Sequence, residues 1–78
     1  MEAKQVIVYT QPGCGPCAAE KEFLNNNGVE FEERDIRANP EYLRELMELG
    51  AQATPTTLVD EEVIMGFDRA KLSDLLDL

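Results

Sequence analysis

Two cysteines are the residues whose type and spacing could carry chemistry in this chain. Cys14 and Cys17 are the only cysteines among its 78 residues, and Gly15 and Pro16 separate them. A pair at this spacing can pass between a dithiol and a disulfide, or can supply thiolate ligands to a metal. Any cysteine chemistry of the protein must therefore take place within residues 14–17.

Other uses of the two thiols are less consistent with the sequence. A structural zinc site needs four ligands, and the chain has two cysteines and no histidine, so even a zinc site shared between chains is disfavoured. A purely structural disulfide would close a very short loop and so constrain the unfolded chain little. Two buried cysteines acting as small apolar side chains remain an alternative, but the turn at Pro12 and Gly13 favours exposure of Cys14. We expect redox chemistry and no bound metal.

The residues around the cysteines predict a strand, a turn and the start of a helix. Residues 6–9, Val-Ile-Val-Tyr, are typical of a strand buried on both faces. Gln-Pro-Gly at 11–13 predicts a turn, and residues 15–27 are rich in helix formers that end at an Asn-Gly pair. This order places both thiols in the first turn of the helix.

The helix start gives the two thiols different roles. If the helix begins after Cys14, that residue is the N-cap and its sulfur can accept a backbone hydrogen bond. Pro16 has no N–H, so the donor is expected to be Cys17. The bond and the helix dipole favour a thiolate on Cys14, which should attack a substrate disulfide, while Cys17 should resolve the mixed disulfide.

The rest of the chain supplies the elements that must position this site. We expect an edge strand over residues 29–34, a helix over 40–49 after the N-cap Asn39, and a last helix capped by Asp68, with Phe67 contacting Leu72. Residues 54–60 predict a turn into a strand, residues 60–62 a hairpin loop and residues 63–65 its second strand. The prediction is one domain over residues 1–78.

Composition and charge exclude some classes of function. Sixteen acidic and seven basic residues give a formal charge of -9, which disfavours binding to nucleic acid. Residues 1–5 lack the features of a signal peptide, and no apolar segment is long enough to span a membrane. We expect a cytoplasmic monomer without membrane or nucleic-acid partners.

Three motifs in this order and spacing resemble the thioredoxin superfamily, and in size and layout the chain is similar to glutaredoxin-like redoxins. The motifs are Tyr-Thr followed by Cys-Gly-Pro-Cys within residues 9–17, Ala-Thr-Pro-Thr at 53–56 and Gly-Phe-Asp at 66–68. The resemblance implies an α/β fold of the order βαβ-α-ββ-α, in which a four-stranded mixed sheet of order 2-1-3-4 has three helices on its two faces. It covers essentially the whole chain.

The resemblance also implies the remaining site residues. Pro55 should be cis and lie against the active site, and the backbone of Thr54 should pair with a bound peptide or glutathione. Other members of the site are the active-site loop and a second substrate-binding segment, namely Pro12, Gly13, Gly15, Pro16, Gly66, Phe67 and Asp68. Phe67 has an alternative interpretation as a helix staple in the core.

The electron donor is inferred from departures within the motifs. Gly-Pro between the cysteines is the pair associated with thioredoxins, whereas glutaredoxins usually carry Pro-Tyr. Gly66 and Phe67 are closer to redoxins that reduce ribonucleotide reductase and are recharged by thioredoxin reductase than to the Gly-Gly of glutathione-binding relatives. Pro16 also withholds an N–H from the thiolate, so we expect a more reducing protein.

The sequence therefore predicts an oxidoreductase that reduces protein disulfides and is recharged by thioredoxin reductase, with no organic cofactor because the electrons reside on the two sulfurs. One alternative is a glutaredoxin that uses glutathione as reductant. Another is a module that holds an iron–sulfur cluster with one cysteine and glutathione, which Pro16 and the second cysteine disfavour.

The proton acceptor for Cys17 has no candidate in the sequence. Residues 6–9 carry no carboxylate, and we identify no buried carboxylate near the site. Glu20 and Glu22 are interpreted as helix residues whose charges oppose thiolate formation, and Lys21 as a charge that favours it. Water is then the expected acceptor.

Overall fold

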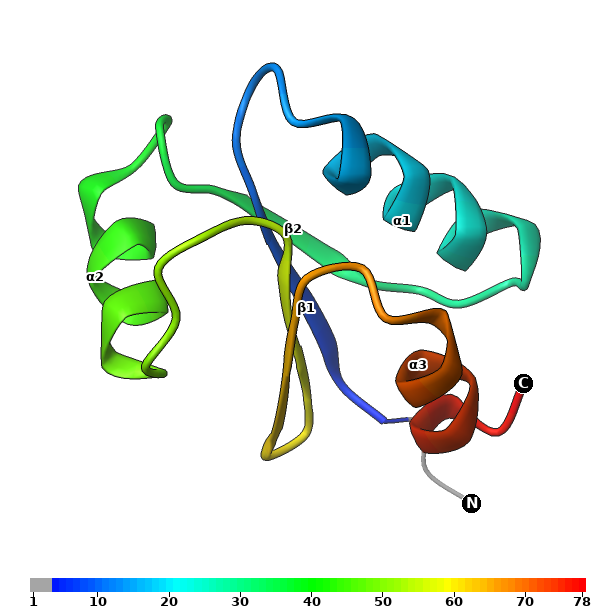
Figure 1. The fold of residues 1–78 in the computed structure, drawn as a ribbon. Coiled ribbons are helices and arrows are strands. Elements are labelled where there is room, and N and C mark those ends of the chain that lie inside the picture. Colours follow the sequence, from blue (N-terminus) through cyan, green and yellow to red (C-terminus); the bar gives the residue numbers. More distant parts are fainter. Residues whose placement is uncertain (1–3) are drawn as a thin grey trace.

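A four-stranded sheet with three helices makes up the computed structural model, which describes residues 4–78 (Figure 1). Met1, Glu2 and Ala3, part of the segment examined for a signal peptide, lie outside the described residues. The elements in chain order are β1 Val6–Thr10, α1 Gly15–Asn26, β2 Glu32–Asp35, α2 Pro40–Glu48, β3 Thr56–Val59, β4 Glu62–Met65 and α3 Arg69–Leu76.

The sheet has the order β2-β1-β3-β4, which confirms the predicted topology. β1 pairs in parallel with β2, because α1 carries the chain back over the sheet between them. β3 runs antiparallel to β1, and β4 returns antiparallel to β3. β1 is therefore an interior strand, with β2 and β4 at the edges.

The helices lie on both faces of the sheet, with α1 and α3 on one face and α2 on the other (Figure 1). Successive side chains of β1 point to opposite faces of the sheet. Val6 and Val8 pack with Leu24 of α1, whereas Ile7 and Tyr9 pack in the cluster that contains Leu46 of α2. Two-sided burial explains the uninterrupted apolar run of this strand.

The second strand begins three residues later than predicted, so the expectation of a strand over 29–34 is wrong at its start. The Val29 N–H donates to the Leu24 carbonyl at 2.9 Å, and Gly28, with φ of +70°, donates to Asn25 at 3.1 Å. These two bonds close the C-terminus of α1 in a Schellman motif. Because the Val29 N–H is committed to the helix, pairing with β1 starts at Glu32.

The remaining predicted elements are present with small shifts at their ends. α2 ends at Glu48 rather than at residue 49, and the Ala51 N–H closes it on Leu46. The hairpin loop is shorter than predicted, because Glu62 already pairs with Val59 and so belongs to β4. At α3, the predicted N-cap is confirmed: the Asp68 carboxylate accepts a hydrogen bond from the Lys71 N–H.

Leu24 tests the packing that holds α1, and with it both cysteines, on the sheet. Its side chain is 0% exposed, so Leu24→Ala should lower the free energy of unfolding by about 2–5 kcal/mol. Leu43→Ala is the matched control, because Leu43 on α2 is 42% exposed and its truncation should cost far less. Urea denaturation of the two variants measures both values, and equal losses would contradict the assigned core.

Candidate active site

The first turn of α1 has the predicted geometry. Cys14 is the N-cap with an extended backbone, φ of -98° and ψ of 104°, and Gly15 and Pro16 occupy the first two helical positions. The Cys17 N–H donates a hydrogen bond to the Cys14 Sγ at 3.1 Å. Pro16 has no N–H to donate. Among the described residues of the first helical turn, only Cys17 donates a hydrogen bond to the Cys14 side chain.

The two cysteines form a disulfide, and their side chains differ in access to solvent. Cys14 and Cys17 are bonded through their sulfurs, with their Cα atoms 5.2 Å apart. Cys14 is partly exposed, whereas Cys17 is 2% exposed. A partner sulfur can therefore reach Cys14 from solvent, while Cys17 lies under the helix.

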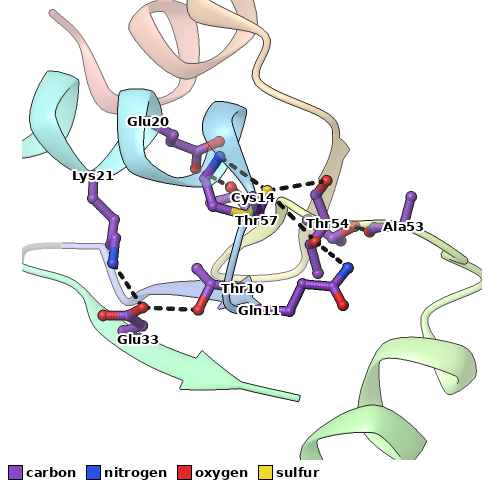
Figure 2. The surroundings of a disulfide bond; sticks show 11 residues. Thr10, Gln11, Cys14, Glu20, Lys21, Glu33, Ala53, Thr54 and Thr57 are labelled. Atoms are coloured by element: carbon purple, nitrogen blue, oxygen red, sulfur yellow. Dashed lines mark hydrogen bonds and ion pairs between the residues drawn. A yellow bond between two sulfur atoms is a disulfide. The ribbon is translucent and has the colours of Figure 1, made fainter. Parts of the chain in front are cut away.

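The loop before β3 lies directly against Cys14, as Figure 2 shows. The Cys14 Sγ is 3.7 Å from the Thr54 carbonyl oxygen and 3.6 Å from the Thr54 Oγ1. The Thr54–Pro55 peptide bond is cis, as the resemblance implies. Gln11, which the sequence assigned only to a turn, donates from its Nε2 to the Thr54 Oγ1 at 2.9 Å and so links the two loops.

The segment at 66–68 reaches the site through its backbone. The Gly66 N–H donates to the Pro55 carbonyl at 2.8 Å, which joins the end of β4 to the cis-proline loop. Phe67 is half-buried in the cluster that contains Leu72, and its ring centroid lies 5.8 Å from that of Phe23. Packing of Phe67 against this cluster is consistent with the staple interpretation. A substrate contact by Phe67 or Asp68 stays a prediction.

A small hollow of about 280 Å³ lies beside the cysteines. Its lining comes from the end of β1, the active-site loop, α1 and β2, and consists of Thr10, Gln11, Pro12, Gly13, Cys14, Cys17, Ala18, Lys21, Glu33 and Asp35. A larger hollow, of about 1140 Å³, lies at the other end of β1 and contains none of the predicted site residues. The smaller hollow is therefore the one from which a substrate can reach the cysteines.

Lys21 is the one cation among the lining residues, and its charge is compensated. Its Nζ lies 2.9 Å from the Glu33 Oε2, which also accepts a hydrogen bond from the Thr10 Oγ1 at 2.8 Å. The hydrogen bonds from Lys21 and then Thr10 lower the pKa of Glu33. This pair keeps Glu33 ionised and reduces the effect of Lys21 on the thiolate.

Glu20 is a buried carboxylate that the sequence analysis missed, so the expectation of no such group near the site is wrong. It is 0% exposed and lies on the sheet-facing side of α1 with Cys17 and Leu24. The Thr57 Oγ1 donates to its Oε2, as Figure 2 shows, while its Oε1 has no partner among the described residues. Burial raises the pKa of Glu20, and the Thr57 hydrogen bond opposes that rise.

The signal that could have found Glu20 is its spacing. Cys17, Glu20 and Leu24 are three and four residues apart, which is the spacing of one helical face. Because Cys17 and Leu24 both face the sheet, the residue between them on that helical face, Glu20, must face it as well. The sequence analysis treated residue 20 as a helix former whose charge opposes thiolate formation, without assigning it to a face of the helix.

Neither a metal cluster nor a membrane-spanning helix is found in the part of the chain that the structure describes. No group of three or more His, Cys, Asp or Glu side chains there is arranged to hold a metal ion. None of the described helices has the length and apolar character needed to cross a membrane.

The raised pKa of Glu20 predicts a pH dependence of stability. Between the ordinary value of 4.5 and the raised value, the folded protein binds a proton that the unfolded chain has lost. This contribution to the free energy of unfolding is therefore greatest below the unfolded pKa and is lost as pH rises through the folded pKa. Glu20→Gln should remove the loss and stabilise the oxidised protein increasingly toward higher pH.

Urea denaturation of the oxidised proteins at a series of pH values measures this effect. Glu22→Gln is the control, because Glu22 lies on the same helix and is exposed. The difference between Glu20→Gln and the parent protein should grow with pH, whereas that for Glu22→Gln should change little. Parallel curves for the parent and Glu20→Gln would show that the carboxyl is not perturbed by burial.

Comparison with known proteins agrees with this geometry. The family model named Glutaredoxin matches residues 6–64. The Gene 56 protein of Mycobacterium phage D29 is 34% identical over 76 residues, which cover 92% of this chain and 82% of that protein. The glutaredoxin-like protein NrdH of Lactococcus lactis subsp. lactis is 30% identical over 70 residues, covering 90% and 97%.

Solved structures show the same relationship. The thioredoxin-like protein BC3987 superposes with a TM-score of 0.89 at 41% identity, over 92% of this chain and all of that one (100%). NrdH-redoxin from Escherichia coli gives a TM-score of 0.84 at 25% identity, over 91% and 93%. With the family match spanning residues 6–64, these likenesses show that the chain belongs to the glutaredoxin family.

Proposed function

We propose that this protein is a dithiol oxidoreductase that reduces disulfides in other proteins. The observation that carries the proposal is the asymmetry of the cysteine pair. Cys14 is partly exposed and caps the helix through the 3.1 Å bond from the Cys17 N–H, while Cys17 is buried behind it. The cap and the helix dipole favour a thiolate on the accessible sulfur, which is the attacking species in disulfide exchange.

The reaction follows from this asymmetry. The Cys14 thiolate attacks one sulfur of the target disulfide, and the other target sulfur leaves as a thiolate that takes up a proton. Cys17 then loses its proton and attacks the Cys14 Sγ, which releases the second target sulfur as a thiol. Two electrons pass to the target, and the protein is left with the Cys14–Cys17 disulfide seen in the structure.

Thr54 and Gly66 support a place for the target beside Cys14. The Thr54 carbonyl oxygen is 3.7 Å from the sulfur, so its backbone can pair with an extended peptide that brings its disulfide there. Gly66 is exposed and its N–H is hydrogen-bonded to the Pro55 carbonyl, so we assign it to the same side of the target-binding site as Thr54. We assign Phe67 and Asp68 to support this side of the site and to contact the target at its edge.

Thioredoxin reductase is the proposed electron donor, in the reducing environment of the cytoplasm. The Gly-Pro pair between the cysteines supports this choice, and the structural relative from Escherichia coli is described as having a thioredoxin-like activity profile. The cation that lines the hollow, Lys21, is paired with Glu33, which weakens it as a site for the carboxylates of glutathione. Glutathione is the alternative donor.

Two reconstituted systems distinguish the donors. With insulin as the disulfide substrate, NADPH and thioredoxin reductase should give turnover, measured as loss of NADPH absorbance. Glutathione with glutathione reductase should give little. Cys14→Ser should abolish turnover, because it removes the attacking sulfur. Turnover with glutathione alone would overturn the donor, and no turnover with either would overturn the function.

Cys17→Ser tests the resolving step. Without the second thiol, the mixed disulfide between Cys14 and a target cannot be released internally and should accumulate. Non-reducing electrophoresis with insulin should show a protein–insulin adduct that dithiothreitol removes. Cys14→Ser, which cannot form the adduct, is the control. Full dithiol activity in Cys17→Ser would contradict the role of this residue.

A further inference from the structure

Cys17 is buried at the point in the reaction where it must lose a proton. Its side chain is 2% exposed, so bulk water has little direct contact with its sulfur. The proposed function requires the thiolate of Cys17, because only the thiolate attacks the mixed disulfide. A buried group close to Cys17 is therefore favoured over bulk water as the proton acceptor.

Glu20 is placed to be that group. It lies three residues after Cys17 in α1, and residues at this spacing are neighbours on one helix face, with Cβ atoms about 5–6 Å apart. Both side chains are buried against the sheet. In Figure 2 the Glu20 carboxylate lies on the side of α1 where Cys14 and Thr57 are found.

The two carboxylate oxygens of Glu20 have different surroundings. Oε2 is held by the hydroxyl of Thr57 in β3, whereas Oε1 is buried without a hydrogen-bond partner among residues 4–78. A buried oxygen without a partner is costly, and few occur in native proteins. In the disulfide state the Cys17 sulfur carries no proton, whereas the reduced thiol is a donor one helical turn away. In the reduced state the Cys17 thiol can therefore donate the hydrogen bond that Glu20 Oε1 lacks in the disulfide state.

We propose that Glu20 is the proton acceptor for Cys17 in the resolving step and the proton donor to Cys17 when the disulfide is reduced. The proposal rests on the proposed function, in which Cys17 resolves a mixed disulfide on Cys14. It gives Glu20 the catalytic role of proton acceptor, for which the sequence analysis expected water. Thr57 is the positioning residue, because its hydroxyl fixes the carboxylate.

The step balances in both directions. In resolution, the Cys17 S–H bond breaks and the proton passes to the Glu20 carboxylate, directly or through one water molecule. The Cys17 sulfur bonds to the Cys14 Sγ, and the target sulfur leaves with the electron pair of the broken bond. When an external dithiol reduces the disulfide, Cys17 leaves as a thiolate and takes the proton back from the Glu20 carboxyl.

Burial supports this role by raising the pKa of Glu20 toward that of a thiol, which improves it as a base. Charged groups of the surrounding elements do not counter this effect. Lys21 of α1 pairs with Glu33 of β2, and the Arg69 guanidinium of α3 lies over the Phe23 ring, 5.3 Å from its centroid.

The core clusters on this side of the sheet, under α1 and α3, are apolar. They contain Val6 and Val8 of β1, Val59 of β3, Ile64 of β4 and Leu72 of α3, and Thr57 of β3 contributes the hydroxyl that bonds Glu20. Cys17 is the other titratable residue among the buried positions of α1. A change in the charge of Glu20 is therefore tied to the state of the two sulfurs.

A two-phase reaction with the dye disulfide 5,5′-dithiobis(2-nitrobenzoate) isolates the step. Attack by Cys14 releases one coloured thiolate, and attack by Cys17 on the mixed disulfide releases the second. In stopped flow, Glu20→Gln should leave the first phase unchanged and slow the second at least about tenfold. General acid–base groups typically contribute about 10²–10⁴-fold to a rate. Glu22→Gln, the exposed control on α1, should match the parent protein in both phases.

The pH profile of the second phase separates a proton acceptor from a structural role. In the parent protein the rate should rise through the pKa of Glu20 and then level off. In Glu20→Gln it should keep rising about tenfold per pH unit up to the pKa of the Cys17 thiol, because only the thiolate fraction reacts. Thr57→Val should move the parent plateau to higher pH, since the Thr57 hydrogen bond lowers the pKa of Glu20.

The outcomes distinguish this inference from the proposed function. Release of two thiolates by the parent protein and of one by Cys17→Ser supports the roles of the cysteines. If Glu20→Gln then keeps the parent rate and pH profile in the second phase, the role of Glu20 is overturned while the function stands. Equal slowing of both phases, with a changed circular dichroism spectrum, would also overturn it in favour of a structural role.

Discussion

The hydrogen bond from the Cys17 N–H to the Cys14 Sγ joins the start of α1 to the chemistry of the site. As an N-cap it satisfies one of the free donors of the helix, a contribution of about 1 kcal/mol for ordinary capping side chains. When Cys14 is a thiolate the bond becomes charge-assisted and roughly twice as strong. The helix start therefore favours the reduced state, and Pro16, which has no N–H, limits the donors from the helix backbone to Cys17. The Thr54 hydroxyl, 3.6 Å from the same sulfur, adds a donor from outside the helix.

The fold positions this bond by burying β1 on both faces. α1 is held on one face through Leu24, and α2 is held on the other through Leu46. β3 pairs with β1, so the loop that contains Thr54 and Pro55 emerges next to the end of β1, where the cysteine loop begins. The two walls of the site thus meet because strands far apart in the sequence are neighbours in the sheet.

Local signals in the sequence account for the parts of the fold and site that could be predicted. The β-branched run predicted β1, the Pro-Gly turn and Cys14 predicted the helix start, and Asp68 predicted the cap of α3. The strand order and the cis bond at Pro55 came from the resemblance, because neither has a local signal. The error at Val29 arose because its N–H closes α1, and apolar alternation does not report which carbonyl an amide chooses.

Glu20 could not be placed from local signals, because its partner Thr57 is 37 residues away in the sequence. A glutamate within a run of helix formers is ordinarily solvated, and only the packing of α1 on β3 makes this one buried. Burial of a carboxylate with one unpartnered oxygen opposes folding, so the position conflicts with the rest of the sequence. Such conflicts concentrate at functional sites. Here the conflict is one helical turn from Cys17, the sulfur that releases a proton in the proposed reaction, so a feature that is unfavourable for folding is suited to that reaction.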